Sequence, residues 1–322
     1  MESHFAIRLA QASVRCAILM ETCVMSQAAL APLRADLDLD FEHAAGVDFD
    51  TGLDYESNRR ARGTWEVTAV GSQRASADKG TREYFQQMRD YRYGYETPWI
   101  PEMFRFDQLA GKSVLEIGVG NGIDATEMAW NGAHYTGIDI TQNHLALTRQ
   151  NFEQSGLETP YRLIEGDLLT TPFHEPFDTV YSFGVLHHIS HEQRYLERIR
   201  QILRPDGTLM FAVYGKYSFF NAWMTATWFT RNRCRNSYDD WRSHVAELSP
   251  LGDPVTIKIR SRQEVEAGLS AAGFQVISYA KRGFVQNYLP GVGRFLKPNG
   301  WTLQTLGSLL GWYHIFHCRQ EE

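Results

Sequence analysis

The chain has 322 residues, of which 43% are hydrophobic and 22% are charged, so it can bury at least one large core. A net charge of −6 and a pI near 6.0 argue against nucleic acid as a partner, because phosphate binding requires clustered Lys and Arg. The four cysteines form no CxxC pair, and nothing in their spacing indicates a disulfide framework or a zinc knuckle, so free thiols in a reducing cytoplasm are expected.

Residues 1–80 are expected to form a partly ordered N-terminal extension. The apolar stretch at 16–20 is interrupted by Glu21 and is too short for a signal peptide or a membrane span. The following stretch, 36–54, is acidic and has no clear periodicity. We expect it to be an arm that packs on the main domain or on a second subunit, so a homo-oligomer is a possible assembly.

An amphipathic helix is predicted at residues 81–95, and Pro98 ends it. Its apolar face carries Tyr84, Phe85, Met88, Tyr91 and Tyr95.

From Lys112 onward, short apolar runs alternate with helical patterns, which predicts a parallel sheet covered on both faces. We expect strands at residues 113–117, 134–138, 161–165, 179–183 and 208–214. A helix is expected at 123–130. A second helix would begin after a cap at Thr141 and run to about 154, with Gly156 as its stop. A third would begin at a capping box of Ser190 and Gln193 and run to 203. A turn is predicted at 204–207, and the core domain would span 81–214.

The alternation of strands and helices is interrupted at residues 215–257, which we expect to form a helical cap over the substrate site. Residues 258–322 would complete the sheet, with a helix at 261–272 and strands at 274–281 and 312–319. Residues 284–310 would be a further insertion at the rim of the sheet.

The most informative stretch is 114–122, with the sequence VLEIGVGNG. Its apolar residues predict a buried strand that Glu116 closes, and Gly118, Gly120 and Gly122 follow at alternating positions. A ligand can lie against such a turn because no Cβ stands in the way. The motif resembles motif I of the class I S-adenosylmethionine (SAM) dependent methyltransferases.

The resemblance implies a Rossmann-like seven-stranded sheet, mostly parallel with an antiparallel last strand, and SAM as the cofactor. The three glycines and Asn121 would lie against the methionine part of SAM, and Glu116 would hold the loop or the ligand amine. The alternative is a tight strand-to-helix turn without a ligand. The G-x-G-x-G spacing differs from the G-x-G-x-x-G of dinucleotide sites.

Further candidate residues follow the second and third strands. Asp139 ends the second strand, where a carboxylate can accept hydrogen bonds from both ribose hydroxyls, and Ile140 would flank the adenine. By resemblance, Asp167 would accept a hydrogen bond from the adenine amino group, and Leu168 would offer its backbone. The alternative for each acid is purely local: an Asp beside a helix N-terminus, or an Asp in a turn.

The stretch 182–188, with the sequence SFGVLHH, follows the fourth strand and resembles the region after the acidic motif in small-molecule methyltransferases. Phe183 would contact the cofactor, and His187, or secondarily His188, could act as a general base, because imidazole titrates near neutral pH. Either histidine could instead only shape the pocket. His187, His188 and His191 do not converge easily on one ion, so no metal is predicted.

Arg92 and Tyr93 lie in the predicted helix at 81–95, which resembles the helix that covers the SAM carboxylate in this family. Arg92 could pair with that carboxylate in a bidentate manner. Otherwise, the helix packs on the sheet and Arg92 is solvated.

The predicted cap is rich in aromatic residues interleaved with arginines. This pattern suits an acceptor with an apolar or aromatic body and an acidic group, although a packed helical subdomain would have the same composition. The residues are Phe219, Phe220, Trp223, Trp228, Phe229, Tyr238 and Trp241, with Arg231, Arg233, Arg235 and Arg242.

We therefore predict a SAM-dependent methyltransferase of a small organic molecule, in specialised metabolism, with an O, N or C acceptor. A nicotinamide oxidoreductase is disfavoured, because the glycine spacing differs and no lysine has a tyrosine four positions before it. Two alternatives remain: an enzyme that uses SAM without methyl transfer, such as a cyclase or decarboxylase, and a non-catalytic partner subunit of the same fold.

Overall fold

The computed structural model describes residues 42–43, 55–67 and 69–321. In this part of the chain, eight strands form one sheet in the order β1-β4-β3-β2-β5-β6-β8-β7. The strands are β1 Glu42–His43, β2 Ser113–Ile117, β3 His134–Asp139, β4 Tyr161–Glu165, β5 Phe177–Phe183, β6 Leu203–Tyr214, β7 Phe274–Arg282 and β8 Tyr313–Gln320. The apolar stretch at 16–20 and most of the acidic stretch at 36–54 lie outside the described residues.

The predicted sheet is confirmed from β2 to β8. Pairs from β4 to β6 are parallel, whereas β8, the last strand, is inserted antiparallel between β6 and β7. The two-residue β1 adds a parallel pair to β4 at the edge, which the sequence pattern did not predict. The strand order reverses at β2, between β3 and β5, and the crevice beyond such a reversal is where open α/β sheets bind ligands.

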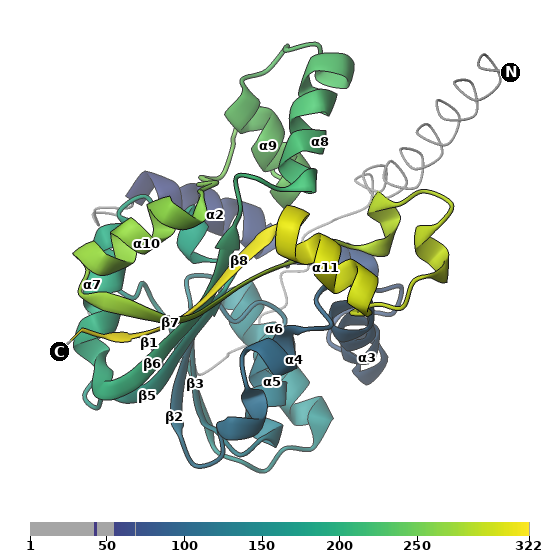
Figure 1. Cartoon of the computed structure of the whole chain (residues 1–322). Helices are drawn as coiled ribbons and strands as arrows, with labels where there is room; N and C mark the ends of the chain where they lie inside the picture. The colour runs from purple at the N-terminus through teal and green to yellow at the C-terminus, as the bar shows by residue number, and fades with distance from the viewer. Residues whose placement is uncertain (1–41, 44–54, 68, 322) are drawn as a thin grey trace, which may run out of the picture.

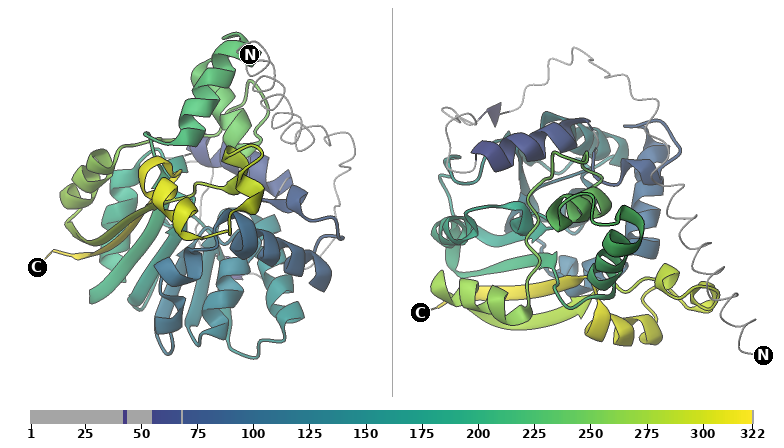
Figure 2. Two further views of the ribbon diagram at one scale, coloured as in Figure 1. Left: turned by 45° about the vertical axis from the view of Figure 1, so that its right-hand side comes forward. Right: turned by 90° about the horizontal axis from the view of Figure 1, so that it is seen from above.

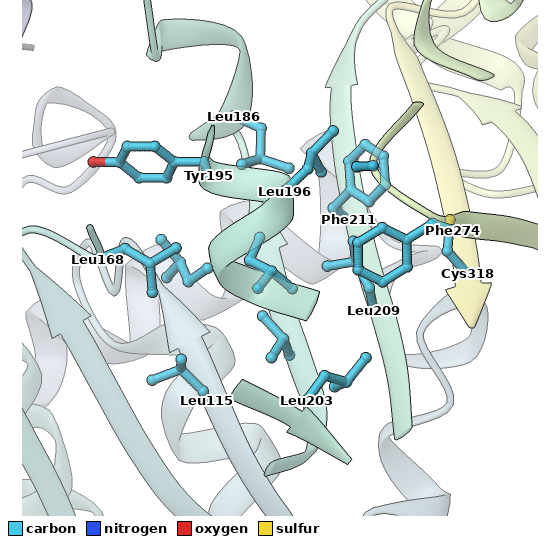
Figure 3. Packing of buried hydrophobic residues seen from close by; sticks show 14 of the residues in the cluster. Leu115, Leu168, Leu186, Tyr195, Leu196, Leu203, Leu209, Phe211, Phe274 and Cys318 are labelled. Atoms are coloured by element: carbon cyan, nitrogen blue, oxygen red, sulfur yellow. The ribbon is translucent and has the colours of Figure 1, made fainter. Parts of the chain in front are cut away.

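Helices cover both faces of the sheet (Figure 1). On one face, α7 Glu192–Ile202 and α10 Arg262–Ala271 pack their apolar side chains into the core shown in Figure 3. On the other face lie α4 Ile100–Met103, α5 Ile123–Trp130 and α6 Gln142–Ser155. The strands between them are apolar on both sides, as a doubly covered sheet requires.

The N-terminal helices extend the second layer. Helix α3, Arg82–Tyr91, buries Tyr84, Phe85 and Met88 against α5 and α6, as its predicted apolar face requires. A π-helical turn, Arg92–Glu96, continues it toward the predicted end at Pro98. Helix α2, Tyr55–Val67, lies in the predicted extension and contacts α6.

Three local predictions are wrong. Helix α7 begins at Glu192 without a side-chain cap, so Ser190 and Gln193 form no capping box. Thr141 occupies the cap position of α6, but its hydroxyl donates to Asp139 Oδ1 at 2.8 Å and caps nothing. The predicted turn at 204–207 is a bulge inside β6, because the pairing with β5 shifts register there.

Two insertions rise beyond the sheet at the end of β6. Helices α8 Phe219–Thr227 and α9 Tyr238–Glu247 form a pair above the strand ends, and α11 Trp301–Leu310 packs beside them on β7 (Figure 1, Figure 2). These elements fall in the predicted cap and the predicted rim insertion. None of the helices described here has both the length and the apolar character to cross a bilayer.

Candidate active site

A cavity of about 800 Å³ lies beyond the carboxyl ends of the strands. Its inner end is formed by the glycine loop and the residues that follow β3, β4 and β5, and its outer end by α8, α9 and parts of residues 70–96 and 283–313. This volume is near the upper end of the ~300–1,000 Å³ common for single ligand sites. The cavity therefore has the size of a ligand site.

The three glycines of the loop have different structural roles, although all have positive φ. A Cβ on Gly118 would lie 2.3 Å from Cγ2 of Val185, and a Cβ on Gly122 would lie 2.8 Å from Cα of Thr148. A Cβ on Gly120 would meet no atom within 4 Å and would enter the cavity that this residue lines. Gly120 thus offers bare backbone to a ligand, whereas Gly122 allows α5 and α6 to pack closely.

Asp139 lines the cavity at the end of β3, but the protein already engages both of its carboxylate oxygens. Oδ1 accepts from the backbone N–H of Thr141 at 2.9 Å and from its hydroxyl. Oδ2 accepts from the backbone N–H of Val119 at 3.0 Å and contacts Nδ1 of His144 at 3.2 Å. Burial alone would raise the pKa of Asp139, but His144 and the bonds from Thr141 outweigh it and lower that pKa. Asp139 therefore also braces the glycine loop against β3, beyond the ribose role predicted for it.

Asp124, which the sequence analysis did not single out, is the centre of a buried polar cluster. Its Oδ1 accepts from Arg92 Nε at 2.7 Å and from Tyr93 at 2.6 Å, and its Oδ2 accepts from Tyr181 at 2.7 Å. Burial would raise the pKa of Asp124, but the charge of Arg92 outweighs it and lowers that pKa. An acidic residue in the first turn of a helix was the available signal.

This cluster corrects the prediction for Arg92. The guanidinium directs Nε and Nη2 at Asp124, so its bidentate partner is a residue of the chain. It also lies 4.6 Å from the ring centroid of Phe183, and both residues line the cavity. Only the remaining nitrogen, Nη1, is left to meet a ligand. Tyr93 is absent from the cavity lining and acts through Asp124.

Glu116 and Asn121 anchor the two ends of the glycine loop. Glu116 accepts from the Tyr135 hydroxyl at 2.5 Å, and burial raises its pKa well above the ordinary value, with a further contribution from Asp124. Asn121 accepts from the Tyr84 hydroxyl at 3.2 Å and donates to the carbonyl of Val70. The loop is thereby tied to β3 on one side and to the N-terminal helices on the other.

Of the four residues predicted to surround the cofactor at this end, three line the cavity and one does not. Ile140, Leu168 and Phe183 line the cavity. Asp167 does not, and its carboxylate accepts from the backbone N–H of Leu169 at 2.8 Å, as an Asp in a turn does. The local alternative thus describes the Asp167 side chain in this structure.

The sequence analysis preferred His187 over His188 as the general base, whereas the positions of the two rings favour His188. His187 is fully buried, lies outside the cavity lining and stacks on Tyr214 with ring centroids 3.6 Å apart. Burial lowers its pKa well below the ordinary value, and neither ring nitrogen has a hydrogen-bond partner among the residues that the structure describes. His188 lines the cavity instead.

The orientation of His188 comes from the cap insertion. Its Nδ1 lies 2.7 Å from the carbonyl oxygen of Thr256, which can only accept, so Nδ1 is the donor in this contact. Nε2 lies 3.7 Å from Glu247 Oε1, which also accepts from the Tyr214 hydroxyl at 2.7 Å. The edge of the Trp65 ring packs on His188. Neither Glu247 nor Trp65 was predicted.

Ligand atoms of His187, His188 and Glu247 lie within 4.8 Å of one another. The sequence analysis considered His191 as the third group and predicted no metal, whereas this group includes the carboxylate of Glu247 from α9. Two imidazoles and a carboxylate are a donor set for a divalent transition metal.

Part of the predicted acceptor cap faces the cavity. Phe220, Trp223, Trp241, Arg231 and Arg235 line it, as does Glu96, whose pKa is raised by burial. The other predicted residues have local roles or lie elsewhere on the cap; for example, Arg242 donates to the carbonyl of Ile257 and pairs with Asp239.

Comparison with known proteins agrees with this architecture. Residues 114–207 match the family model described as Methyltransferase domain. A stretch of 118 residues, 37% of the chain, is 33% identical to ubiquinone biosynthesis O-methyltransferase of Stutzerimonas stutzeri (strain A1501), and 32% identical to the protein of that name from Pseudomonas putida (strain W619). The match spans about half the length of these relatives (50% of each).

Among solved structures, magnesium protoporphyrin IX methyltransferase from Synechocystis PCC 6803 with bound SAH has a TM-score of 0.53 at 12% identity, covering 82% of this chain and all of that one. The same protein with bound SAM gives a TM-score of 0.50, also at 12% identity, and covers 84% of this chain. The chain therefore carries a methyltransferase domain with the fold of the class I SAM-dependent methyltransferases. The predicted fold class is confirmed, and residues 114–207 match a methyltransferase domain.

Proposed function

We propose that the chain is a SAM-dependent methyltransferase that methylates a hydroxyl group of a small acceptor with an apolar or aromatic body. The observation that carries this proposal is the bare backbone at Gly120, which faces a cavity with the size of a ligand site. SAM, when bound, supplies an electrophilic methyl group. The O-methyltransferase names of the relatives support the choice of a hydroxyl acceptor.

The cofactor end of the cavity fits SAM chemically. Gly120 leaves room for a ligand chain against the loop, and Ile140 and Leu168 provide apolar walls for an adenine. The carboxylates of Asp139 and Glu116 also line this end, and lone pairs shared with their present donors can accept ribose hydroxyls or an ammonium group.

His188 is the proposed general base at the acceptor end. Its Nε2 lone pair takes the hydroxyl proton of the acceptor, and Glu247 at 3.7 Å then stabilises the imidazolium. Trp65, Trp223 and Trp312 line the cavity and keep water from the reacting atoms. Because methyl transfer is an in-line displacement, holding the two ligands in line is the main task of these walls.

The experiment has a binding arm and a catalytic arm. Titration calorimetry with S-adenosylhomocysteine (SAH) tests the cofactor site. If SAH does not bind at millimolar concentration, the result would favour the alternative of a non-catalytic partner subunit with the same fold. Turnover is then measured with SAM and a panel of phenols and catechols. His188→Gln should lower kcat about 10²–10⁴-fold with an unchanged SAH affinity, the usual contribution of a general base.

His187→Leu is the matched control, because it removes the neighbouring imidazole, which lies outside the cavity lining. It should keep kcat within a few-fold of wild type. Equal losses in the two variants would assign the histidine pair a structural role only. Turnover of a substrate without formation of SAH would favour an enzyme that uses SAM without methyl transfer.

A further inference from the structure

Exposed large apolar side chains are concentrated in one short segment of the described chain. Of the twelve large hydrophobic residues that are exposed there, five lie between residues 292 and 310. They are Val292, Phe295, Trp301, Leu309 and Leu310, and Trp301 and Phe295 are the two most exposed of all twelve, at 80% and 75%. We call this surface the 292–310 face. A cluster of this kind on one segment marks an interaction surface.

The 292–310 face is the outer side of an ordered segment. Helix α11 turns Leu303 and Gly307 inward, and a Cβ on Gly307 would lie 3.6 Å from Cα of Arg282 on β7. Trp301 and Leu309 lie on the opposite side of the helix and are exposed. The apolar side chains are therefore held outward by the packing of the helix, which lies in front of β8 in Figure 1.

The charge of this segment differs from that of the chain as a whole. The chain has a net charge of −6, yet residues 267–320 contain no Asp or Glu. Arg294 and Lys297 lie within the 292–310 face and are exposed, and the Arg294 guanidinium lies 4.7 Å from the ring centroid of Phe295. Basic side chains among exposed Trp, Phe and Leu are the combination that binds the interface of an anionic bilayer.

Residues shortly before this segment line the cavity. Val285, Asn287 and Tyr288 line the cavity, and the Tyr288 ring packs on Phe219 of α8 at 4.9 Å between centroids. A ligand leaving a bilayer beneath the 292–310 face would thus meet the wall of the outer end of the cavity.

We propose that the 292–310 face docks on an anionic phospholipid membrane, with Trp301, Phe295 and Leu309 in the headgroup region. The partner is inferred from the combination of exposed Trp, Phe and Leu side chains with Arg294 and Lys297 on a segment without acidic residues, which complements an anionic lipid surface. The docking itself does not depend on methyl transfer. Combined with the proposed function, it makes a membrane-dissolved acceptor the expected substrate class.

The test is co-sedimentation of the full-length protein with vesicles of phosphatidylcholine alone or with 30% phosphatidylglycerol added. The protein should bind the anionic vesicles more tightly, and added salt should weaken the binding. Phe295→Ser/Trp301→Ser/Leu309→Ser should lower the partition coefficient at least about tenfold. Arg294→Gln/Lys297→Gln should lower it about fivefold per charge on anionic vesicles only.

Matched controls place the same changes elsewhere. Val67→Ser/Trp130→Ser/Ile277→Ser alters exposed apolar residues outside the face, and Lys112→Gln/Arg319→Gln alters exposed basic ones. Both controls should bind vesicles like wild type. All variants should keep wild-type SAH affinity, so a failure of docking is distinguishable from a failure of the cofactor site.

Three outcomes would overturn the proposal. The first is no binding of wild type to anionic vesicles, and the second is an equal loss of binding in variants and controls. The third is a change of sedimentation velocity in the Phe295 triple variant without any change in vesicle binding, which would make the face a contact between two copies of the chain.

Discussion

Alanine at Gly120 and alanine at Gly122 should affect different properties of the protein. Both glycines have positive φ, at 54° and 71°, so either substitution costs about 1–2 kcal/mol of folding free energy from the backbone alone. At Gly122 the new Cβ would also lie 2.8 Å from Cα of Thr148, and such overpacking adds about 1–3 kcal/mol. We therefore expect Gly122→Ala to lose about 2–5 kcal/mol in total and Gly120→Ala about 1–2 kcal/mol.

The effect on the cofactor site should be the reverse. The Cβ of Gly120→Ala has open space within the protein and projects into the cavity, where a ligand lies against the loop. A methyl group forced into that contact costs about 1–3 kcal/mol, which corresponds to an SAH affinity about ten- to hundredfold weaker. Gly122 is absent from the cavity lining, so SAH should still bind to the folded fraction of Gly122→Ala.

Urea unfolding followed by circular dichroism gives the stability of both variants, and titration calorimetry at a temperature where both are folded gives their SAH affinity. The two measurements should rank the variants in opposite orders. Wild-type SAH affinity in Gly120→Ala would refute the assignment of the loop as the cofactor cradle. Equal stability losses in the two variants would refute the packing argument for Gly122.

Three further predictions concern the buried polar groups. Asp124→Asn should destabilise the protein by about 3–5 kcal/mol in thermal or urea unfolding, because it leaves the Arg92 charge without its partner; a loss below 1 kcal/mol would show that the pair is not buried in solution. Asp139→Asn should lower the unfolding free energy by about 1–3 kcal/mol, because the carboxylate braces the loop, and it should also lower the SAH affinity, because the carboxylate lines the site. If the stability falls but titration calorimetry finds an unchanged SAH affinity, Asp139 has no ribose role. Burial lowers the pKa of His187, so below pH 6.5 the unfolded chain binds a proton that the folded chain does not. As the pH falls from 6.5 to 5, the unfolding free energy of wild type should therefore decrease relative to that of His187→Leu by up to about 1.4 kcal/mol per pH unit. Unfolding free energies that change equally with pH in both proteins would contradict this prediction.

The sheet was predictable from the sequence because its strands are short apolar runs bounded by clear stops. The bounds of β2, β4 and α5 agree with the prediction at both ends. The capping box at Ser190 was wrong because a short-range motif does not show where the preceding loop turns. Likewise, the turn at 204–207 has turn composition, but tertiary pairing with β5 keeps it within a bulged strand.

The candidate site was predictable where a motif lies on consecutive residues, as in the glycine loop. It was not predictable where one side chain must choose between partners. Asp139 and Arg92 both point toward the site, yet each satisfies its hydrogen bonds with groups of the protein that no spacing rule identifies. The pair His187 and His188 shows the same limit, because the sequence places both after β5 but not which ring faces the cavity.

The orientation of the proposed base, His188, depends more on the cap insertion at residues 215–257 than on the Rossmann-like core. The Rossmann-like core places His188 at the end of β5, but Thr256, 68 positions later, accepts from its Nδ1, and Glu247 of α9 faces its Nε2. The same insertion supplies Trp223, Arg231 and other walls of the outer cavity. Orientation of the base and shape of the acceptor pocket are thus linked through one segment. A different insertion on the same core would therefore change both together.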